Sequence, residues 1–473
     1  MMQFLIDIKE IVEDTQSTIF KMFLFVKIIL WYGPFFGIPF FVLAFSCYRI
    51  LIYKFFKLIA MTPMDICFLS KKNYERYNII GVIKFKNYEP MKIKEVLIEK
   101  AIKRIKRLRM KIEYTLFNYY WKEVSENEAI RTITINEEEI KDLEMYIENE
   151  ISQYIDIRKR LPYEFKLMKY KDECVLLFKF DHILSDGLSI VSLICSLDDN
   201  YNKEIYPTIM QMNKKYEMSK LNILIHSFMF IFYSFYSMYI MFFQSSGKTP
   251  FKSSKFTTGK INMSIGKSHL ISSFNKIRKE KGLTFNEAIT SIISNVCYDI
   301  SSNIKELKCM IPVSRRGIPS ELSKIHLVNE ANIIYLNLPL IKDLSKNNLS
   351  LIQNRLKNTF NNSFLNYSYL MWPKILCNFI SFRLINYFSM IYFSNVDLII
   401  SNIPGPKREL SYNGNTVKEI YTVVSPGKGV PFITVMSYND KFIVSLSIDT
   451  KLSIDSKDII NKIDYKIDQF INQ

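Results

Sequence analysis

The hydrophobic and polar positions of this chain form long uncharged stretches and, around them, a series of helix and strand patterns. Apolar positions recur with the period of a helix at 91–111, 137–159, 267–281, 285–302, 349–362 and 456–471. Strand patterns cover 78–86, 113–123, 174–181, 307–313, 332–338, 397–401 and 418–424, and a hairpin is expected at 431–448 with its turn at Asn439 and Asp440. Strands mixed with helices in this way predict an α/β or α+β fold.

The first uncharged stretch, residues 28–48, is long enough to span a bilayer and is expected to anchor the protein in a membrane. Acidic residues dominate before it, whereas Arg49, Lys54 and Lys57 follow it, so the positive-inside rule places the downstream body in the cytosol. Gly and Pro residues interrupt the stretch, which leaves a re-entrant hairpin as the alternative.

A second uncharged stretch, 221–243, taken alone, is typical of another membrane-spanning helix or of a segment that lies on the membrane surface. A third apolar region, 368–394, is interrupted by Lys374 and Arg383, which favours an amphipathic helix packed on the body. With a hydrophobic share of 48% and a mean hydropathy of +0.03, the chain is expected to be a soluble body with a few membrane-contacting segments.

The chain is strongly basic, and its cysteines have no pattern. A net charge of +17 favours anionic partners such as lipid headgroups or a phosphorylated cofactor. No zinc finger or RNA-binding signature is present, so no nucleic-acid partner is expected. The seven Cys form no C-x-x-C pair, which argues against a disulfide framework and against a zinc site. A basic cluster at 103–111 is interpreted as a solvated helix face, with contact to anionic lipid or a cofactor phosphate as the alternative.

The most informative chemistry lies at the end of a buried-strand pattern, in the sequence FDHILSDG at 180–187. A histidine poised near neutrality can take a proton from an alcohol, and His182 is the one histidine of four in such a setting. Asp186 is expected to hold the local loop. Gly187 is expected to let the chain turn with a backbone conformation that other residues resist.

Further motifs follow in a definite order: MTPMD at 61–65, TFNE at 284–287, IPVSRR at 311–316 and SNIPGP at 401–406. Together with H-x-x-x-D-G, this series resembles the wax ester synthase/diacylglycerol acyltransferase family, which belongs to the coenzyme-A-dependent acyltransferase superfamily. The resemblance covers about residues 60 to 470. The family usually carries two adjacent histidines, and here Asp181 replaces the first while His182 keeps the second. A neighbouring carboxylate is expected to raise the pKa of His182.

The resemblance implies a fold and a domain organisation. Two chloramphenicol-acetyltransferase-like lobes would meet at a central tunnel, preceded by an N-terminal membrane anchor. The expected ranges are 1–57 for the anchor, 58–215 for the N-terminal lobe, 216–256 for a hydrophobic interfacial linker and 257–473 for the C-terminal lobe. A linker that crossed the bilayer once would separate the halves of the active site, so residues 221–243 are expected to be interfacial or re-entrant.

The same resemblance implies roles in catalysis. His182 acts as the general base that activates the acceptor hydroxyl. Asp186 stays structural and pairs with an arginine, for which Arg316 is the candidate. Gly187 keeps the loop open.

Substrate contacts are expected from a second set of residues, namely Asp181, Asn286, Arg316, Ser401 and Asn402. Other interpretations stay open for most of them. Asn286 is favoured as a helix cap, and Arg316 is either a structural partner or a contact to a CoA phosphate. Ser401 and Asn402 either contact substrate or support a rigid turn.

The function implied by the resemblance is acyl transfer from acyl-CoA to a long-chain alcohol, giving a wax ester, or to diacylglycerol, giving triacylglycerol. Acyl-CoA is a co-substrate, and neither a cofactor nor a metal is expected. The alternatives are a non-catalytic membrane-bound lipid-binding relative and acyl transfer to another alcohol or an amine. The protein is expected in a membrane, either at the endoplasmic reticulum with a cytosolic catalytic body or at the lipid droplet surface. The sequons at Asn262, Asn348, Asn361 and Asn366 should then stay unglycosylated.

Overall fold

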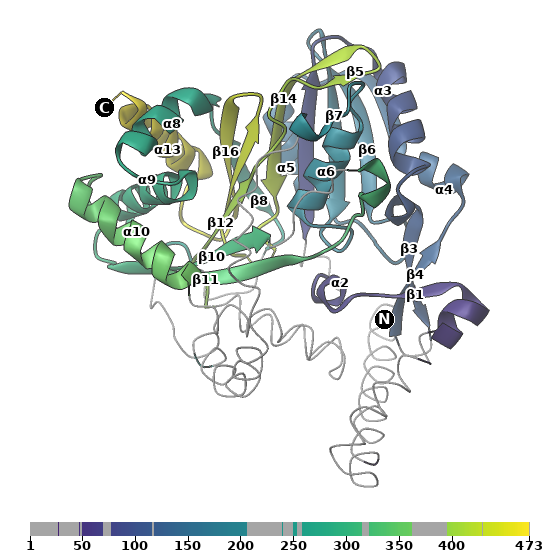
Figure 1. The fold of residues 1–473 in the computed structure, drawn as a ribbon, viewed down its shortest axis with the longest axis horizontal. Coiled ribbons are helices and arrows are strands. Elements are labelled where there is room, and N and C mark those ends of the chain that lie inside the picture. The colour runs from purple at the N-terminus through teal and green to yellow at the C-terminus, as the bar shows by residue number, and fades with distance from the viewer. Residues whose placement is uncertain are drawn as a thin grey trace.

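The computed structural model describes residues 27, 47, 50–69, 77–115, 118–205, 239, 249–252, 258–314, 321–361, 395–427 and 429–472. Within these ranges two large β-sheets stand side by side, and helices cover their outer faces (Figure 1). Apart from Cys47 and Tyr239, the uncharged stretches 28–48 and 221–243 lie outside the described residues, as do the region 368–394 and Arg316. In the part of the chain that is described, no helix is both long and apolar enough to cross a membrane.

The first sheet has six strands in the order β13-β14-β2-β7-β6-β5. Their bounds are β2 Asn78–Phe85, β5 Ile133–Glu139, β6 Tyr163–Tyr170, β7 Glu173–Asp181, β13 Ser411–Tyr412 and β14 Asn415–Val424. Neighbouring strands are antiparallel except β5 and β6, which are parallel. Strands β13 and β14 come from the predicted range 257–473, so the C-terminal half of the sequence completes the sheet that the N-terminal half builds.

Both faces of the first sheet are apolar and covered. One face packs against α3 (Pro90–Val96) and α6 (Gly187–Ser196). The other face packs against α5 (Leu143–Ser152) and also meets residues of the second sheet. Because β7 lies in the middle of this sheet and is buried on both faces, its end is a rigid place from which a side chain can project.

The second sheet has the order β11-β10-β12-β15-β16-β8, with β9 paired to β16. Its strands are β8 Ile261–Ile265, β9 His269–Leu270, β10 Glu306–Ser314, β11 Ala331–Pro339, β12 Leu398–Ile403, β15 Phe432–Tyr438 and β16 Lys441–Asp449. Four helices pack on it: α8 Ile271–Glu280, α9 Phe285–Ile300, α10 Lys346–Asn361 and α13 Ser456–Ile471 (Figure 1). Only β12 pairs parallel with its neighbours, which places its C-terminal end at the same edge as that of β15.

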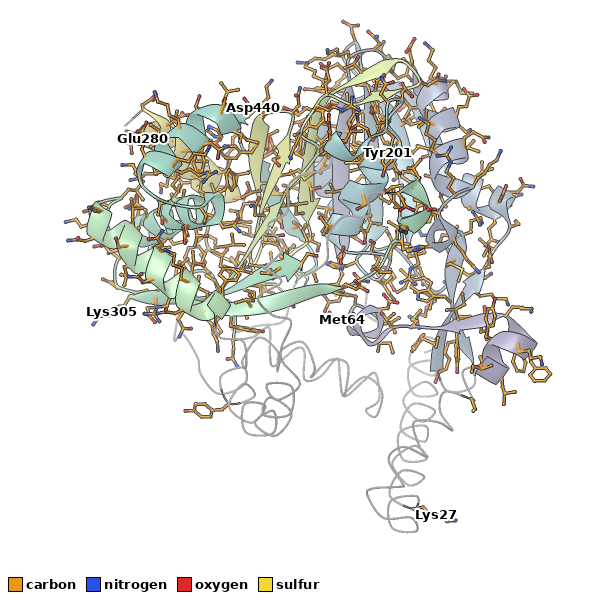
Figure 2. All side chains as sticks on the ribbon, viewed as in Figure 1. Lys27, Met64, Tyr201, Glu280, Lys305 and Asp440 are labelled. Carbon is orange, nitrogen blue, oxygen red and sulfur yellow. The ribbon has the colours of Figure 1, made fainter. Side chains whose placement is uncertain are left out.

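A small third sheet, β1-β4-β3, adjoins the first (Figure 1). It consists of β1 Leu58–Ala60, β3 Met110–Thr115 and β4 Asn118–Glu123, and two short helices accompany it, α2 Pro63–Cys67 and α4 Glu126–Ile130. Met64 on α2 lies at the lower edge of the body (Figure 2). The MTPMD motif therefore forms a short helix next to the two sheets.

Most of the predicted elements are confirmed, and three differ. The predicted helix 91–111 is α3 followed by a π-helical turn at Leu97–Ile102, a 3-10 turn at Lys106–Arg109 and the start of β3. The predicted strand 113–123 contains parts of two antiparallel strands, β3 and β4. The predicted helix 137–159 begins with the end of β5, a strand at the sheet edge whose last three glutamates are exposed and so give no strand alternation.

The predicted hairpin turn is confirmed. Strands β15 and β16 pair antiparallel up to Tyr438 and Lys441, and the two residues between them, Asn439 and Asp440, both have positive φ (44° and 57°). This is the backbone of a two-residue turn that suits Asn and Asp, because their short polar side chains tolerate the left-handed region. Asp440 lies at the upper edge of the body, far from α2 (Figure 2).

Gly405, in the SNIPGP motif, lies where the chain after β12 passes the end of β15. Its N–H donates to Ser437 Oγ (2.9 Å), and a Cβ at this position would lie 1.9 Å from the Ser437 carbonyl oxygen. Because the obstacle is backbone, it cannot rotate away. Gly405→Ala is therefore expected to lower the free energy of unfolding by about 3 kcal/mol, the upper end of the usual cost of overpacking, in a urea titration.

Gly81 in β2 is a matched control for this prediction. A Cβ at Gly81 would meet nothing closer than Thr422 Oγ1 at 4.0 Å. Since a strand loses less entropy on folding with alanine than with glycine, Gly81→Ala is expected to keep the stability or raise it by up to about 1 kcal/mol. Equal urea midpoints for the two variants would show that the close contact between Gly405 and the Ser437 carbonyl does not exclude a larger residue.

Candidate active site around His182

His182 is the first residue after β7, at the point where the chain leaves the first sheet. Its N–H donates to the carbonyl oxygen of Tyr77 (2.9 Å). The N–H of Leu184 donates to the carbonyl oxygen of Asp181 (2.9 Å). The pairing between β7 and β2 continues to Asp181, which lies opposite Asn78. The histidine is thus held by the end of a central strand and by a hydrogen-bonded turn.

The imidazole of His182 contacts an aromatic ring and an amide. The ring of Phe68 stacks on it with 3.8 Å between centroids and 9° between planes, and Nδ1 lies 3.2 Å from Oδ1 of Asn329. Burial lowers the pKa of His182 below its usual 6.5, while the Asp186 carboxylate and hydrogen bonds to Asn329 and to its own backbone act in the opposite direction. The ring is therefore neutral near pH 7, which is the form that can accept a proton.

The expected effect of Asp181 on this pKa is wrong. Asp181 and His182 are adjacent, and side chains alternate between faces along an extended strand, so the carboxylate of Asp181 points elsewhere. It is buried and accepts the N–H of Ile183 (2.9 Å). Burial without a cation raises the pKa of Asp181 to about 7. The net shift of His182 is accordingly set by burial, and the Asp181 carboxyl supports the turn that follows the strand.

Asp186 is the N-cap of α6 and joins the two halves of the chain. Its Oδ1 accepts the N–H of Ser189 (3.0 Å) as a helix N-cap, and its Oδ2 accepts the N–H of Glu330 (2.9 Å). Its own N–H donates to the carbonyl oxygen of Val328 (3.1 Å). These contacts are those of a structural residue. The pairing predicted with Arg316 lies outside the described residues.

Gly187 lies close to the second sheet, and the predicted unusual backbone is wrong. It is the first residue of α6, and its φ is not positive. A Cβ at Gly187 would lie 3.1 Å from Cδ1 of Ile403, at the end of β12. The small residue therefore lets α6 approach the SNIPGP motif, which brings the second sheet next to the His182 turn.

Asp65 of the MTPMD motif is a buried carboxylate beneath this site. It closes a capping box with Thr62 at the start of α2. Its Oδ1 accepts from Asn329 Nδ2 (3.0 Å), and its Oδ2 accepts from Trp121 Nε1 (3.2 Å) and Arg107 Nη2 (2.9 Å). The motif thereby connects the small sheet to the residue that contacts His182.

Arg107 points inward, although it belongs to the basic cluster that was interpreted as a solvated face. Its guanidinium lies 3.6 Å from the ring centroid of Trp121, and it donates to the carbonyl oxygens of Ile183 and Leu184 (3.2 Å each). Lys103, Arg104 and Lys106 of this cluster are exposed, as a solvated face requires, but the chain winds through π and 3-10 turns there and does not form one continuous α-helix. Arg107 instead supports the His182 turn from below.

The predicted substrate residues of the second sheet form a separate group. Asn402 Nδ2 donates to Asn286 Oδ1 (2.6 Å), which ties the end of β12 to the start of α9. The predicted helix cap at Asn286 is wrong, since Thr284 caps α9 and shares a capping box with Glu287. Ser401 is buried in β12 opposite Thr434 of β15. Through Ile403 and Gly187 this group adjoins the His182 turn.

Four residues of the site were not predicted as site residues: Asp65, Phe68, Arg107 and Asn329. The MTPMD motif drew attention to Asp65, and Phe68 follows it closely. Arg107 looked like one of many surface cations, and Asn329 stands in no local pattern. Of these, Asn329 is the residue for which the sequence holds no usable signal.

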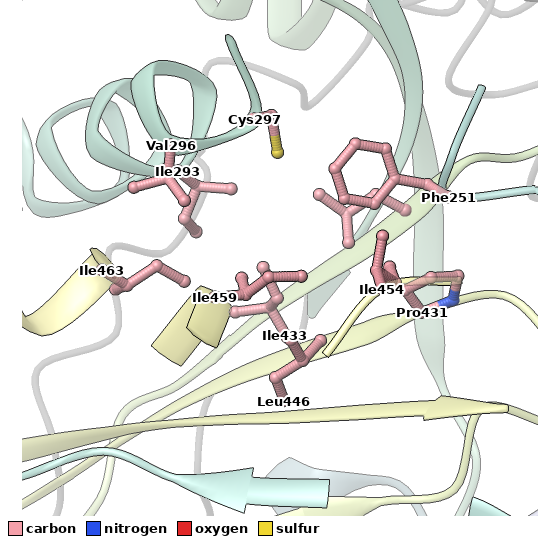
Figure 3. Close-up of a pocket in the computed structure, with 11 residues that line it drawn as sticks. Phe251, Ile293, Val296, Cys297, Pro431, Ile433, Leu446, Ile454, Ile459 and Ile463 are labelled. Carbon is pink, nitrogen blue, oxygen red and sulfur yellow. The ribbon is translucent and has the colours of Figure 1, made fainter. Parts of the chain in front are cut away.

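A small cavity lies elsewhere, in the apolar core of the second sheet (Figure 3). Side chains of α9 and α13, among them Ile293, Cys297 and Ile459, face strand residues such as Ile433 across it. None of its lining residues belongs to the His182 site, so it is a packing void. The central tunnel stays a prediction. Among the described residues no group of His, Cys, Asp or Glu gathers as a metal site.

Comparison with known families and proteins gives two sequence matches. Residues 329–470, a segment that begins with Asn329, match the model of the WS/DGAT C-terminal domain. The chain is also 30% identical over 187 residues to an O-acyltransferase WSD of Acinetobacter baylyi. That match covers 37% of this chain and 38% of the relative, so it spans well under half of either protein.

Comparison with solved structures shows the fold over most of the chain. A wax ester synthase/diacylglycerol acyltransferase from Marinobacter aquaeolei superposes with a TM-score of 0.60 at 17% identity, covering 88% of this chain and all of that one. The trichothecene 15-O-acetyltransferase TRI3 from Fusarium sporotrichioides gives 0.60 at 11% identity, covering 87% and 94%. The starter condensation domain of rhizomide synthetase gives 0.57 at 10% identity, covering 88% and 94%. Residues 329–470 are thus similar to the C-terminal domain of the wax ester synthase/diacylglycerol acyltransferase family, and the chain has the mixed α/β fold of these acyltransferases and condensation domains.

Proposed function

We propose that this protein is an acyl-CoA-dependent O-acyltransferase that esterifies a long-chain alcohol or diacylglycerol, with His182 as its general base. The observation that carries the proposal is the neutral imidazole of His182, held at the end of β7 with its Nδ1 beside Asn329 Oδ1. The family match of residues 329–470 supports acyl transfer as the reaction class.

In the proposed reaction, Nε2 of His182 removes the proton from the acceptor hydroxyl while the oxygen attacks the thioester carbon of acyl-CoA. The tetrahedral intermediate carries a negative charge on its former carbonyl oxygen and needs hydrogen-bond donors there. On collapse the carbon–sulfur bond breaks, and the imidazolium of His182 protonates the departing thiolate. The base is thus regenerated, and no covalent bond forms between the acyl group and the protein at any stage.

The remaining site residues receive proposed roles in the same scheme. Ser401 and Asn402, at the end of β12, are proposed to contact the substrate or its oxyanion. Asn286 would hold Asn402 in place through their hydrogen bond. Arg316 would contact a CoA phosphate, and Asp181 would shape the acceptor side of a tunnel between the lobes.

The proposal includes attachment to a membrane, at the endoplasmic reticulum with a cytosolic body or at the lipid droplet surface. The uncharged stretch 28–48 supports it. So do apolar residues just after that stretch, since Ile50, Phe55 and Phe56 are 64%, 71% and 58% exposed in the helical segment 50–56. A membrane would supply both an apolar environment for these side chains and a source of lipid acceptor. The interfacial position of 221–243 belongs to the same proposal.

An acyl-transfer assay tests the proposal. Full-length protein in a membrane fraction receives labelled palmitoyl-CoA with either hexadecanol or diacylglycerol, and the neutral lipids are separated. We expect labelled wax ester or triacylglycerol, with an equal amount of free CoA released. Folded protein that forms neither product, and releases no CoA with other alcohols or amines, would overturn the enzymatic proposal and leave the lipid-binding alternative.

A further inference from the structure

Asn329 joins three parts of the chain that are far apart in the sequence. Its side-chain amide is 4% exposed, and Nδ2 donates to Asp65 Oδ1 (3.0 Å) and to the carbonyl oxygen of Ile183 (3.1 Å). Its Oδ1 lies 3.2 Å from Nδ1 of His182. Both N–H groups of the amide are therefore used, and the oxygen is the atom that faces the histidine.

The partners of Asn329 allow only this orientation of the amide. Asp65 receives Trp121 Nε1–H, the Arg107 guanidinium and the N–H of Thr62, groups that can only donate. Asp65 is consequently an acceptor, as is the carbonyl oxygen of Ile183. The Asn329 atom that contacts both must be its nitrogen, because an oxygen there would face two further oxygens without a hydrogen between them.

The orientation of the amide decides where the proton of the neutral imidazole lies. An amide oxygen has no hydrogen to donate, so a hydrogen bond to His182 requires a proton on Nδ1. A neutral imidazole carries one N–H proton, which leaves the lone pair on Nε2.

We propose that Asn329, oriented by Asp65, holds His182 in the tautomer with the proton on Nδ1, so that Nε2 is the basic nitrogen. Asn329 and Asp65 are then positioning residues for the reaction, and this inference rests on the proposed function. The stacking of Phe68 on the imidazole limits rotation of the same ring. Because His182 and Asp65 come from the N-terminal half and Asn329 opens the C-terminal domain, the base is complete only when the two halves are packed together.

The tautomer can be measured without an assay. The chain has only four histidines, so selective ¹⁵N-histidine labelling gives a simple spectrum, and His182→Ala identifies the signals of His182. In the full-length protein we expect a protonated Nδ1 and an unprotonated Nε2. In Asn329→Ala the population should shift toward a proton on Nε2. A wild-type spectrum with the proton on Nε2 would overturn the inference, whatever the variants do.

Asn295 offers a matched control. It is 1% exposed and lies in α9, and its Nδ2 likewise donates two hydrogen bonds, here to the backbone carbonyls of Ile341 (3.0 Å) and Lys342 (2.8 Å). Asn295→Ala removes a comparable amide and is expected to lower stability without changing the His182 spectrum. A spectrum altered equally by both alanine variants would mean that Asn329 acts only through general packing.

Kinetics separate the inference from the proposed function. Asn329→Ala is expected to lower kcat/KM by up to about 100-fold, as a misplaced catalytic group does, with most of the loss in kcat. Its hydrogen bond favours the protonated ring, so its loss should move the acidic limb of the pH profile, already below pH 6.5, to lower pH. The hydrogen bond of the ring to its own backbone and the Asp186 carboxylate also raise the pKa of the ring, and both are unchanged in the variant. If the wild type is active and the activity of Asn329→Ala equals that of Asn295→Ala, the positioning role is refuted and the proposed function stands. If the wild type is inactive but His182 has the expected tautomer, the proposed function is refuted and the positioning of the ring stands.

Discussion

Replacing His182 with alanine is expected to lower kcat/KM for ester formation by about 100- to 10,000-fold, the usual contribution of a general base. In the proposed reaction the neutral imidazole takes the hydroxyl proton, and polar groups that lie close to it, among them Asp186 and Asn329, are bound to backbone or to one another. Asp186 accepts from two backbone amides, and Asn329 uses both N–H groups. Neither is free to act as a replacement base. Release of CoA with hexadecanol or diacylglycerol as acceptor measures the effect.

His326→Ala is the matched control for this prediction, because His326 is exposed on the loop before Asn329. It should retain the activity of the wild type. The thermal unfolding midpoints of both variants should be compared, since loss of the Phe68 stacking could weaken the His182 variant. A folded His182→Ala protein with more than a tenth of the wild-type kcat/KM would mean that another group, or the acceptor alkoxide formed without a base, carries the reaction.

Replacing Arg107 with methionine is expected to lower the free energy of unfolding by about 3–5 kcal/mol, because it leaves the buried carboxylate of Asp65 without its cation. The two side chains are 16% and 1% exposed and lie 2.9 Å apart. The variant also removes the donors to Ile183 and Leu184 and the stacking on Trp121. A urea titration followed by tryptophan fluorescence suits the measurement, since Trp121, one of the three tryptophans of the chain, touches Arg107.

The pair Arg355–Glu306 is a control of the same chemistry at the surface. Its side chains are 37% and 41% exposed and lie 2.7 Å apart, so Arg355→Met should cost less than about 1 kcal/mol. Combining Arg107→Met with Asp65→Leu should cost less than the sum of the two single changes, because no charge is then left buried. Additive costs, or an Arg107 variant as stable as the Arg355 variant, would show that the ion pair does not hold the site.

Local patterns predicted much of the fold, including β2, β7, the β15–β16 hairpin, α9 and α13. Each of these elements depends on the period of its own apolar residues and on the turn preferences of residues such as Asn439. The edge strand β5 and the irregular turns after α3 were missed. The apolar residues of these segments follow neither a helix period nor a strand period for long enough to tell the two apart.

His182, Asp186 and Gly187 could be selected from the sequence because they occur together in one short motif after one buried strand. Their roles were only partly predictable. The backbone freedom expected of Gly187 and the pKa effect expected of Asp181 were both wrong, because each depends on the residues that the fold packs around these positions. Ile403 limits the size at Gly187, and burial decides the pKa of His182.

The order of the motifs was sufficient to predict a mixed α/β fold of the acyltransferase kind and to select His182 as the proposed base. Asn329, Asp65 and Arg107 became parts of one site only when the chain folded. A hydrogen bond between residues 147 positions apart, as between His182 and Asn329, leaves no periodic trace in either segment. The position of the imidazole proton follows from that long-range contact, and therefore from the packing of the two halves of the chain.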